Sequence, residues 1–208
     1  METANRRQCY MCSDPATGVE HVPAKCFFPK GQRENLITVP SCELHNNATS
    51  KDDEYVRGII VSSAGTNKIA LIHWRDGVRK SYLHSPKLFL KTFEMQKDNA
   101  FFHDRARIDT LMVKIAYALY YQVYKRVWQS RPAPFYKQFY FDDGKTDIEV
   151  RLPDYLSIPE YNVFEGANQS VFKYQYLEGK VNGQPNCIFK MNFYEGFEVI
   201  IIPINSPL

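Results

Sequence analysis

Two pairs of residues with metal-binding side chains lie near the N-terminus of the chain. Cys9 and Cys12 are separated by two residues, and Cys42 and His45 repeat that spacing. Each pair can reach one metal ion from a tight turn of backbone, and three thiolates with one imidazole form a closed tetrahedral ligand set for zinc. Because this set leaves no position open for a substrate, we expect a structural Zn²⁺ ion at these four residues.

The cysteines allow two other interpretations, a redox-active Cys9–Cys12 pair or isolated buried thiols. No strand followed by a helix is predicted around Cys9, which argues against redox chemistry. Cys26 and Cys187 lie among apolar and aromatic residues and are interpreted as small packed side chains. The first residues show no secretory signal, so we expect a cytoplasmic protein with metal-bound or free thiols rather than disulfides.

A second set of polar residues lies between these pairs and directly after them. Glu20 and His21 are adjacent, Asn35 follows, and Asn46 comes immediately after the second pair. Histidine is the side chain best suited to take a proton from water at neutral pH. Carboxylate and amide oxygens are the ligands that Mg²⁺ and Mn²⁺ prefer. Asn47 is the alternative to Asn46 as such a ligand.

These motifs, in this order, resemble the HNH endonuclease superfamily, which has a ββα-metal fold. The resemblance covers about the first quarter of the chain and rests on both Cys/His pairs together with Glu20-His21, Asn35 and Asn46. Two positions depart from the family pattern. Asn46 stands where the family name has a histidine, and His45 replaces the more usual fourth cysteine.

The resemblance implies that His21 is the general base that activates water against a phosphodiester. It further implies that Asn35 orients the loop that aims His21, and that Asn46, together with Glu20 or another nearby carboxylate, binds one catalytic Mg²⁺ or Mn²⁺ ion. The implied function is metal-dependent hydrolysis of DNA, leaving 5′-phosphate and 3′-hydroxyl ends. The residues do not distinguish DNA from RNA. Proteins of this kind resemble nucleases of phages, mobile elements or bacterial defence systems.

Hydrophobic periodicity predicts the elements that position these residues. Residues 17–22 and 36–39 are expected to be short strands, and a helix should begin near Cys42. Residues 68–74 and 78–83 are expected to pair as a hairpin around Asp76-Gly77, followed by a short helix over 86–95. His73, His84 and His103 have no ligand partner at metal-binding spacing and are interpreted as surface or core residues.

The clearest helical pattern runs over residues 105–129, where apolar residues recur every three or four positions. Its tyrosines alternate with basic residues, so they either stack on nucleic acid or pack in the core. After a break at Pro132–Pro134, strands are expected at 135–141, 148–152, 171–177, 188–193 and 197–202. The predicted fold is α+β, an N-terminal ββα zinc module followed by a long helix packed on an antiparallel sheet.

We expect three segments, residues 1–62 as the nuclease module, 63–131 as a basic hairpin and helical part, and 132–208 as a β region. Residues 61–140 hold fourteen Lys or Arg against five Asp or Glu, which suits either a nucleic acid or a solvated helix face. Residues 141–208 hold five against ten, which favours a protein partner or an internal brace over DNA. No apolar run is long enough for a membrane span.

Two other functions fit the same residues. A zinc-containing DNA-binding module without turnover would keep the four metal ligands and have no use for His21. A nuclease effector subunit of a larger defence complex would use its acidic β region to bind a larger protein partner. Because a single HNH site cuts one strand, double-strand cleavage would need two sites, for which a homodimer is the simplest source.

Overall fold

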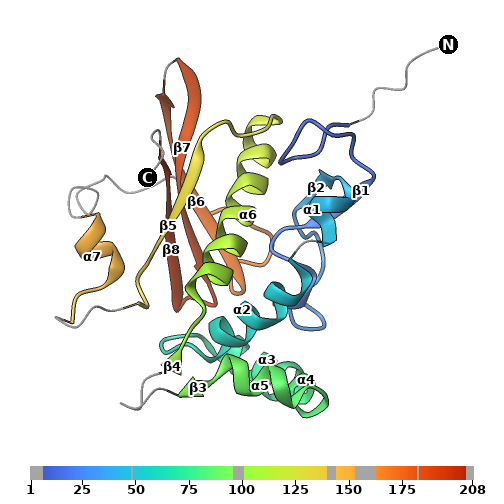
Figure 1. The fold of residues 1–208 in the computed structure, drawn as a ribbon, viewed down its shortest axis with the longest axis vertical. Helices are drawn as coiled ribbons and strands as arrows, with labels where there is room; N and C mark the ends of the chain where they lie inside the picture. The colour runs from blue at the N-terminus through green and yellow to red at the C-terminus, as the bar shows by residue number, and fades with distance from the viewer. Residues whose placement is uncertain are drawn as a thin grey trace.

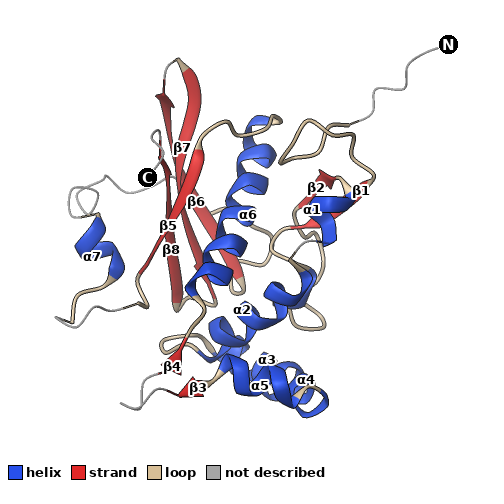
Figure 2. Ribbon diagram, viewed as in Figure 1, coloured by secondary structure: helices blue, strands red, loops and turns tan. Residues whose placement is uncertain are grey.

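The computed structural model describes residues 7–47, 49–95, 101–139, 144–152, 163–181 and 183–204. The chain combines helices with antiparallel sheets, so the predicted α+β class is confirmed (Figures 1 and 2). No helix in these ranges has the length and apolar character needed to cross a lipid bilayer.

A four-stranded antiparallel sheet forms the C-terminal half of the fold, with strand order β5-β8-β7-β6. Its strands are β5 (Arg131–Tyr136), β6 (Phe172–Val181), β7 (Gln184–Phe193) and β8 (Phe197–Ile204). The last three were expected from their apolar runs. β5 begins earlier than predicted and contains Pro132 and Pro134, which an edge strand tolerates because one side of its backbone has no ladder to complete.

The strand expected over residues 148–152 is wrong, because this segment forms helix α7 (Asp147–Arg151). The Thr146 hydroxyl accepts from the backbone N–H of Glu149, and the Glu149 carboxylate accepts from the backbone N–H of Thr146. This capping box fixes the start of a helix in a run that is too short to show helical periodicity. Of the strand expected over 135–141, Tyr136 is the last strand residue, and 140 and 141 lie outside the described residues.

Helix α6 (Arg105–Tyr124) lies between the sheet and the N-terminal hairpin (Figure 1). The Asp104 side chain caps its start by accepting from the backbone N–H of Arg107. It ends before residue 129, the predicted end, because Lys125 adopts a left-handed conformation with a φ of 53°. Its buried residues pack against the sheet on one side and against the N-terminal elements on the other.

The N-terminal elements follow the predicted order of two strands and a helix. β1 (Gly18–His21) pairs antiparallel with β2 (Thr38–Ser41), and the turn of 3₁₀ helix Lys25–Phe27 lies in the connecting loop. The helix expected after Cys42 is divided into α1 (Glu43–Asn47) and α2 (Ser50–Ser62).

The hairpin expected over residues 68–83 is wrong, because this segment is helical. It contains α3 (Lys68–His73), a π-helical turn (Trp74–Val78) and α4 (Arg79–His84). The helix predicted over 86–95 is present as α5 (Pro86–Thr92) but ends earlier, because residues 94–95 form a short strand. The Asn67 side chain caps α3 by accepting from two backbone N–H groups. The Asp-Gly pair that resembled a hairpin turn is instead absorbed in the wider π-helical turn. The short strands β3 (Glu94–Met95) and β4 (Phe101–Phe102) pair with each other before α6.

Candidate metal centre

The backbone brings the two predicted ligand pairs together. A hydrogen bond of 2.9 Å from the Cys9 N–H to the Asp14 carbonyl closes the turn that carries Cys9 and Cys12. Cys42 lies between the end of β2 and the start of α1, and His45 is one turn further along this helix. Backbone N–H groups at the helix start, first that of His45, lower the pKa of the Cys42 thiol, which favours the thiolate form that binds metals.

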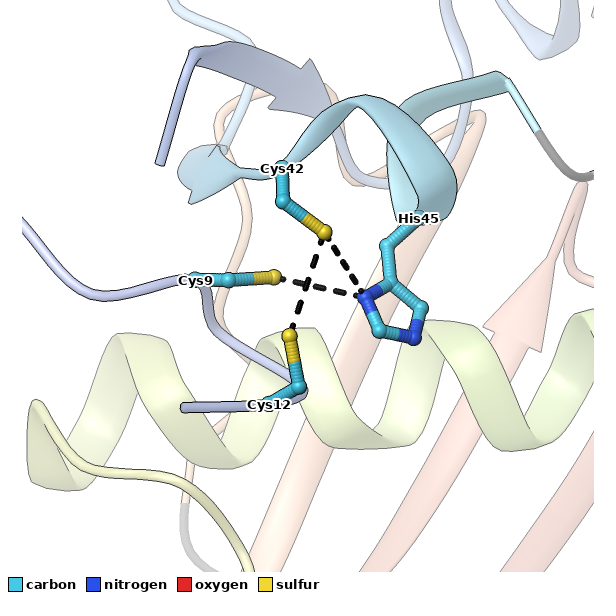
Figure 3. A group of neighbouring side chains, drawn as sticks. All are labelled: Cys9, Cys12, Cys42 and His45. Carbon is cyan, nitrogen blue, oxygen red and sulfur yellow. Dashed lines mark hydrogen bonds between the residues drawn. The ribbon is translucent and has the colours of Figure 1, made fainter. Parts of the chain in front are cut away.

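The four side chains point toward one another (Figure 3), and we call them the Cys/His cluster. Their ligand atoms all lie within 4.8 Å of one another. The Cys12 and Cys42 sulfurs are 3.8 Å apart, and His45 Nδ1 lies 3.5 Å from Cys9 Sγ and 3.1 Å from Cys42 Sγ. A tetrahedral zinc ion with ordinary bond lengths requires about 3.8 Å between sulfurs and about 3.6 Å between sulfur and nitrogen. The donor set therefore has the composition of a zinc site, and the Cys12–Cys42 and Cys9–His45 distances fit one, whereas Cys42 Sγ and His45 Nδ1 lie closer together than a bound zinc ion would hold them.

His21 is the last residue of β1 and pairs with Thr38 in β2. Its ring is partly buried, and Nδ1 is fully buried with no hydrogen-bond partner among the described residues. Burial and, to a smaller extent, the charge of Lys25 lower the pKa of the imidazole. His21 is therefore neutral at pH 7, the protonation state that a general base requires.

Glu20 is buried and already has partners. The Tyr10 hydroxyl donates a hydrogen bond of 3.0 Å to Glu20 Oε2, and the ammonium group of Lys114 on α6 forms a close ion pair with Glu20 Oε1. Lys114 also donates to the Thr49 hydroxyl at 2.5 Å. Burial raises the pKa of Glu20, and the bonds to Lys114 and Tyr10 act in the opposite direction.

Asp53, on α2, is a second buried carboxyl group in this region. It is 8% exposed, and Oδ1 has no hydrogen-bond partner among the described residues. Burial raises its pKa to about 6, while the charge of Lys114 opposes the shift. Asp53, Glu20, His21 and Lys114 all line one small cavity of about 10 Å³.

Sequence reasoning missed Asp53 and Lys114 as members of this site. Asp53 lies in a run of charged residues that resembles a solvated face, and Lys114 is one of the basic residues of the predicted helix. The available signal was the position of Lys114 three residues after Leu111, which continues the buried stripe of α6. A charge on such a stripe needs a buried partner.

The two predicted amides occupy different places. Asn46 is exposed on α1, and its Nδ2 atom lies 3.8 Å from where a Cβ atom on Gly18 would be. Gly18 and Glu20 share one face of β1, about 7 Å apart, so Asn46 and Glu20 approach the same side of the hairpin. Asn35 is exposed in the loop before β2, and no side-chain hydrogen bond joins it to His21 in the described part of the chain. The Asn47 side chain lies outside the described residues.

The tyrosines of α6 pack against the core. Tyr120 is buried and stacks on Trp128 with ring centroids 4.9 Å apart, and Tyr124 donates to the Glu178 carboxylate. Two arginines of this helix are engaged in ion pairs, Arg105 with Asp109 and Asp147 and Arg107 with Asp52. The contacts of Tyr120 and Tyr124 match the interpretation that the tyrosines of this helix pack in the core.

The chain has no match among protein-family models, characterised proteins or solved structures.

Proposed function

We propose that this protein is an HNH-type endonuclease that hydrolyses phosphodiester bonds in DNA with the aid of a divalent cation. In this proposal β1, β2 and α1 form a ββα-metal module, and the Cys/His cluster holds a structural Zn²⁺ ion. The observation that carries it is the position of His21. Its neutral imidazole ends β1 beside two buried carboxyl groups, in a hairpin that the Cys/His cluster ties to α1.

The composition of the Cys/His cluster and its Cys12–Cys42 and Cys9–His45 distances support zinc as the structural ion. Cys9 and Cys42 are buried, and all four protein ligands would be used, so substrate has no access to this metal. Zinc would join the turn at Cys9–Cys12 to the start of α1. This link would fix the hairpin and the helix on which His21 and Asn46 lie.

His21 would act as the general base. It would take a proton from a water molecule while the water oxygen bonds to phosphorus and the bond from phosphorus to the 3′ oxygen breaks. The leaving oxygen takes a proton from solvent, which gives 5′-phosphate and 3′-hydroxyl ends. A Mg²⁺ or Mn²⁺ ion held by Glu20 and Asn46 would stabilise negative charge on the phosphate. The lowered pKa of His21 supports this role, and Asn35 would orient the loop before β2.

One observation favours a second function, a zinc-containing DNA-binding module without turnover. Glu20 is already paired with the Lys114 ammonium group and accepts from Tyr10. A protein in which this ion pair is permanent would have no carboxylate available for a catalytic cation. Such a module would keep the zinc ion, and its DNA affinity would not depend on the imidazole of His21.

Plasmid cleavage separates the two functions. Zinc-loaded protein is incubated with supercoiled plasmid in Mg²⁺, in Mn²⁺ and in chelator, and the His21→Ala variant is compared with His84→Ala, which replaces an exposed histidine on α4. We expect metal-dependent nicking that falls at least about 100-fold in His21→Ala, with unchanged DNA binding, and is unaffected in His84→Ala.

Equal cleavage rates in wild type and His21→Ala would show that His21 is not the general base. Wild-type protein that contains zinc and binds DNA, but nicks nothing in either metal, would establish the binding module instead.

A further inference from the structure

We propose that Glu20 and Asp53 together form the divalent-cation site of this protein, and that the Lys114 ammonium group occupies this site until the cation displaces it. The inference rests on the proposed function. It adds a carboxylate ligand, Asp53, and a resident competitor, Lys114, which the family resemblance does not supply.

Lys114 reaches the site from a distant part of the chain. It lies on α6 and is 7% exposed, and its Nζ atom contacts Glu20 Oε1 on β1 and the Thr49 hydroxyl at the start of α2. Tyr10 fixes the other carboxylate oxygen of Glu20 by a hydrogen bond of 3.0 Å. The ammonium group is thus coordinated by oxygen atoms on two elements, much as a bound cation would be.

The charges in this site do not balance with lysine alone. Two buried carboxyl groups, on Glu20 and Asp53, face one ammonium group. Lys114 bonds Glu20, whereas Asp53 Oδ1 is buried and unpartnered among the described residues. An unpaired buried carboxylate oxygen is costly, and native proteins usually satisfy it with a proton, a water molecule or a cation.

A divalent cation satisfies both carboxylates at once. Mg²⁺ and Mn²⁺ bind carboxylate oxygens, and one such ion neutralises two of them. The cavity between Glu20, Asp53 and Lys114 measures about 10 Å³, close to the space of one water molecule, so the cation and its waters need the room that the lysine head now fills. His21 lines the same cavity, which puts a cation-bound water beside the proposed base.

The test measures cation binding without DNA, so it does not depend on cleavage. Zinc-loaded protein carrying His21→Ala is titrated with Mn²⁺, and free Mn²⁺ is followed by electron paramagnetic resonance. Adding Lys114→Met should tighten Mn²⁺ binding at least about tenfold, because the competing charge is gone. Adding Asp53→Asn should weaken it about tenfold or more.

Two matched variants serve as controls. Asp52→Asn removes the neighbouring carboxylate, which is partly buried and paired with Arg107, and Lys190→Met removes a lysine from a different carboxylate pair, that with Glu198. Neither should change Mn²⁺ affinity. In the His21→Ala protein, equal affinities with and without Lys114→Met, or with and without Asp53→Asn, would overturn the proposal even if the wild-type protein cleaves DNA.

Folding of the lysine variant is part of the same test. Lys114→Met leaves two buried carboxylates without the ammonium group that faces them. In buffer without added divalent cation, the variant should therefore melt at a lower temperature than wild type. Mn²⁺ should raise its melting temperature more than it raises that of wild type, because ligand that binds only the folded state stabilises it by mass action. If the variant is unfolded and Mn²⁺ does not refold it, the cation cannot replace the lysine and the proposal is wrong.

Discussion

His73 is kept as a neutral imidazole by the groups around it. It is buried on α3, and its Nδ1 lies 2.7 Å from the Tyr194 hydroxyl. Because Tyr194 donates its own proton to the Phe27 carbonyl, its oxygen accepts from His73, so Nδ1 carries the hydrogen. Burial, followed by the charges of Arg57 and Arg33, lowers the pKa of His73 to about 4. The residue links α3, the β7–β8 turn and the N-terminal loop through one hydrogen-bonded chain.

The lowered pKa predicts a loss of stability in acid. The unfolded chain binds a proton near pH 6.5 and the folded protein only near pH 4, so this contribution is complete above pH 6.5 and is lost as the pH falls between these values. The loss amounts to about 3 kcal/mol of unfolding free energy. Urea unfolding at several pH values measures it. His73→Asn, which keeps a donor at the Nδ1 position, should flatten this dependence, whereas the exposed His84→Asn should not. An unchanged slope in His73→Asn would show that other groups cause the acid sensitivity.

The short helix α1 depends on the Cys/His cluster more than on its own sequence. Five residues form too few hydrogen bonds for a helix that is stable alone, and α1 begins directly after Cys42. A zinc ion at the cluster would hold this helix against the turn at Cys9. The metal is therefore expected to act as a structural element.

Removal of the ligand Cys42 should disrupt this part of the fold. We expect Cys42→Ser to lose the zinc ion, counted by metal analysis as a fall from one per chain to well below one, and to melt at a lower temperature, since structural zinc contributes directly to folding. Cys26→Ser, at a partly buried thiol outside the cluster, should keep its zinc. Full zinc content in Cys42→Ser would exclude the Cys/His cluster as the site.

Helix α2 requires a glycine at position 58 for packing. A Cβ atom there would lie 1.8 Å from the Tyr82 hydroxyl oxygen of α4 and 3.2 Å from a methyl carbon of Thr92. Gly58 thus allows α2 to approach the α4–α5 pair closely, although alanine is the better helix former. This contact connects the helix that carries Asp53 to the rest of the helical layer.

Gly58→Ala should therefore destabilise the protein by about 1–3 kcal/mol through overpacking, against the gain of about 1 kcal/mol that alanine gives in an open helix. Gly179→Ala on β6 is the matched control, because nothing lies within 4 Å of its Cβ position. Chemical denaturation of both variants gives the comparison. A Gly58→Ala protein as stable as wild type would show that Tyr82 moves aside at no cost.

Across the whole molecule, one hydrophobic core joins regions that are distant in sequence. Its buried members include Phe27 of the N-terminal loop, Leu111 of α6 and Phe193 of β7. Polar contacts cross the same boundaries, since Lys114 pairs with Glu20 and the Asn168 side chain donates to the Glu34 carbonyl. The proposed nuclease module therefore obtains part of its buried surface and its charge partner from the rest of the chain.

The isolated fragment 1–62 should consequently fail to fold, even with zinc. It would expose the surface that α6 and the sheet cover, and it would leave Glu20 and Asp53 without Lys114. Circular dichroism and amide NMR dispersion of the zinc-loaded fragment measure this, with the zinc-loaded full chain as the control. A dispersed spectrum and a cooperative melt for the fragment would mean that the module folds independently.

Local features of this protein could be predicted from its amino-acid sequence alone. Two Cys/His pairs at equal spacing, the period of α6 and the apolar runs of β6, β7 and β8 each carry a signal within a few residues, so they predict the ligand cluster and the long elements correctly. The strand predictions for residues 68–83 and 148–152 were wrong because the short helices found there depend on caps and packing, and a short helix shows no repeated hydrophobic pattern.

The surroundings of the predicted site residues depend on contacts between distant parts of the chain. The pairing of Glu20 with Lys114 joins positions 94 residues apart. Asp53 shares one small cavity with residues of β1 and α6, and its buried Oδ1 has no hydrogen-bond partner among the described residues. Burial sets the cost of a charge, and burial depends on long-range packing that no local pattern contains. For that reason the sequence could name the four residues of the Cys/His cluster, while the buried ion pair of Lys114 with Glu20 became visible only in the folded chain.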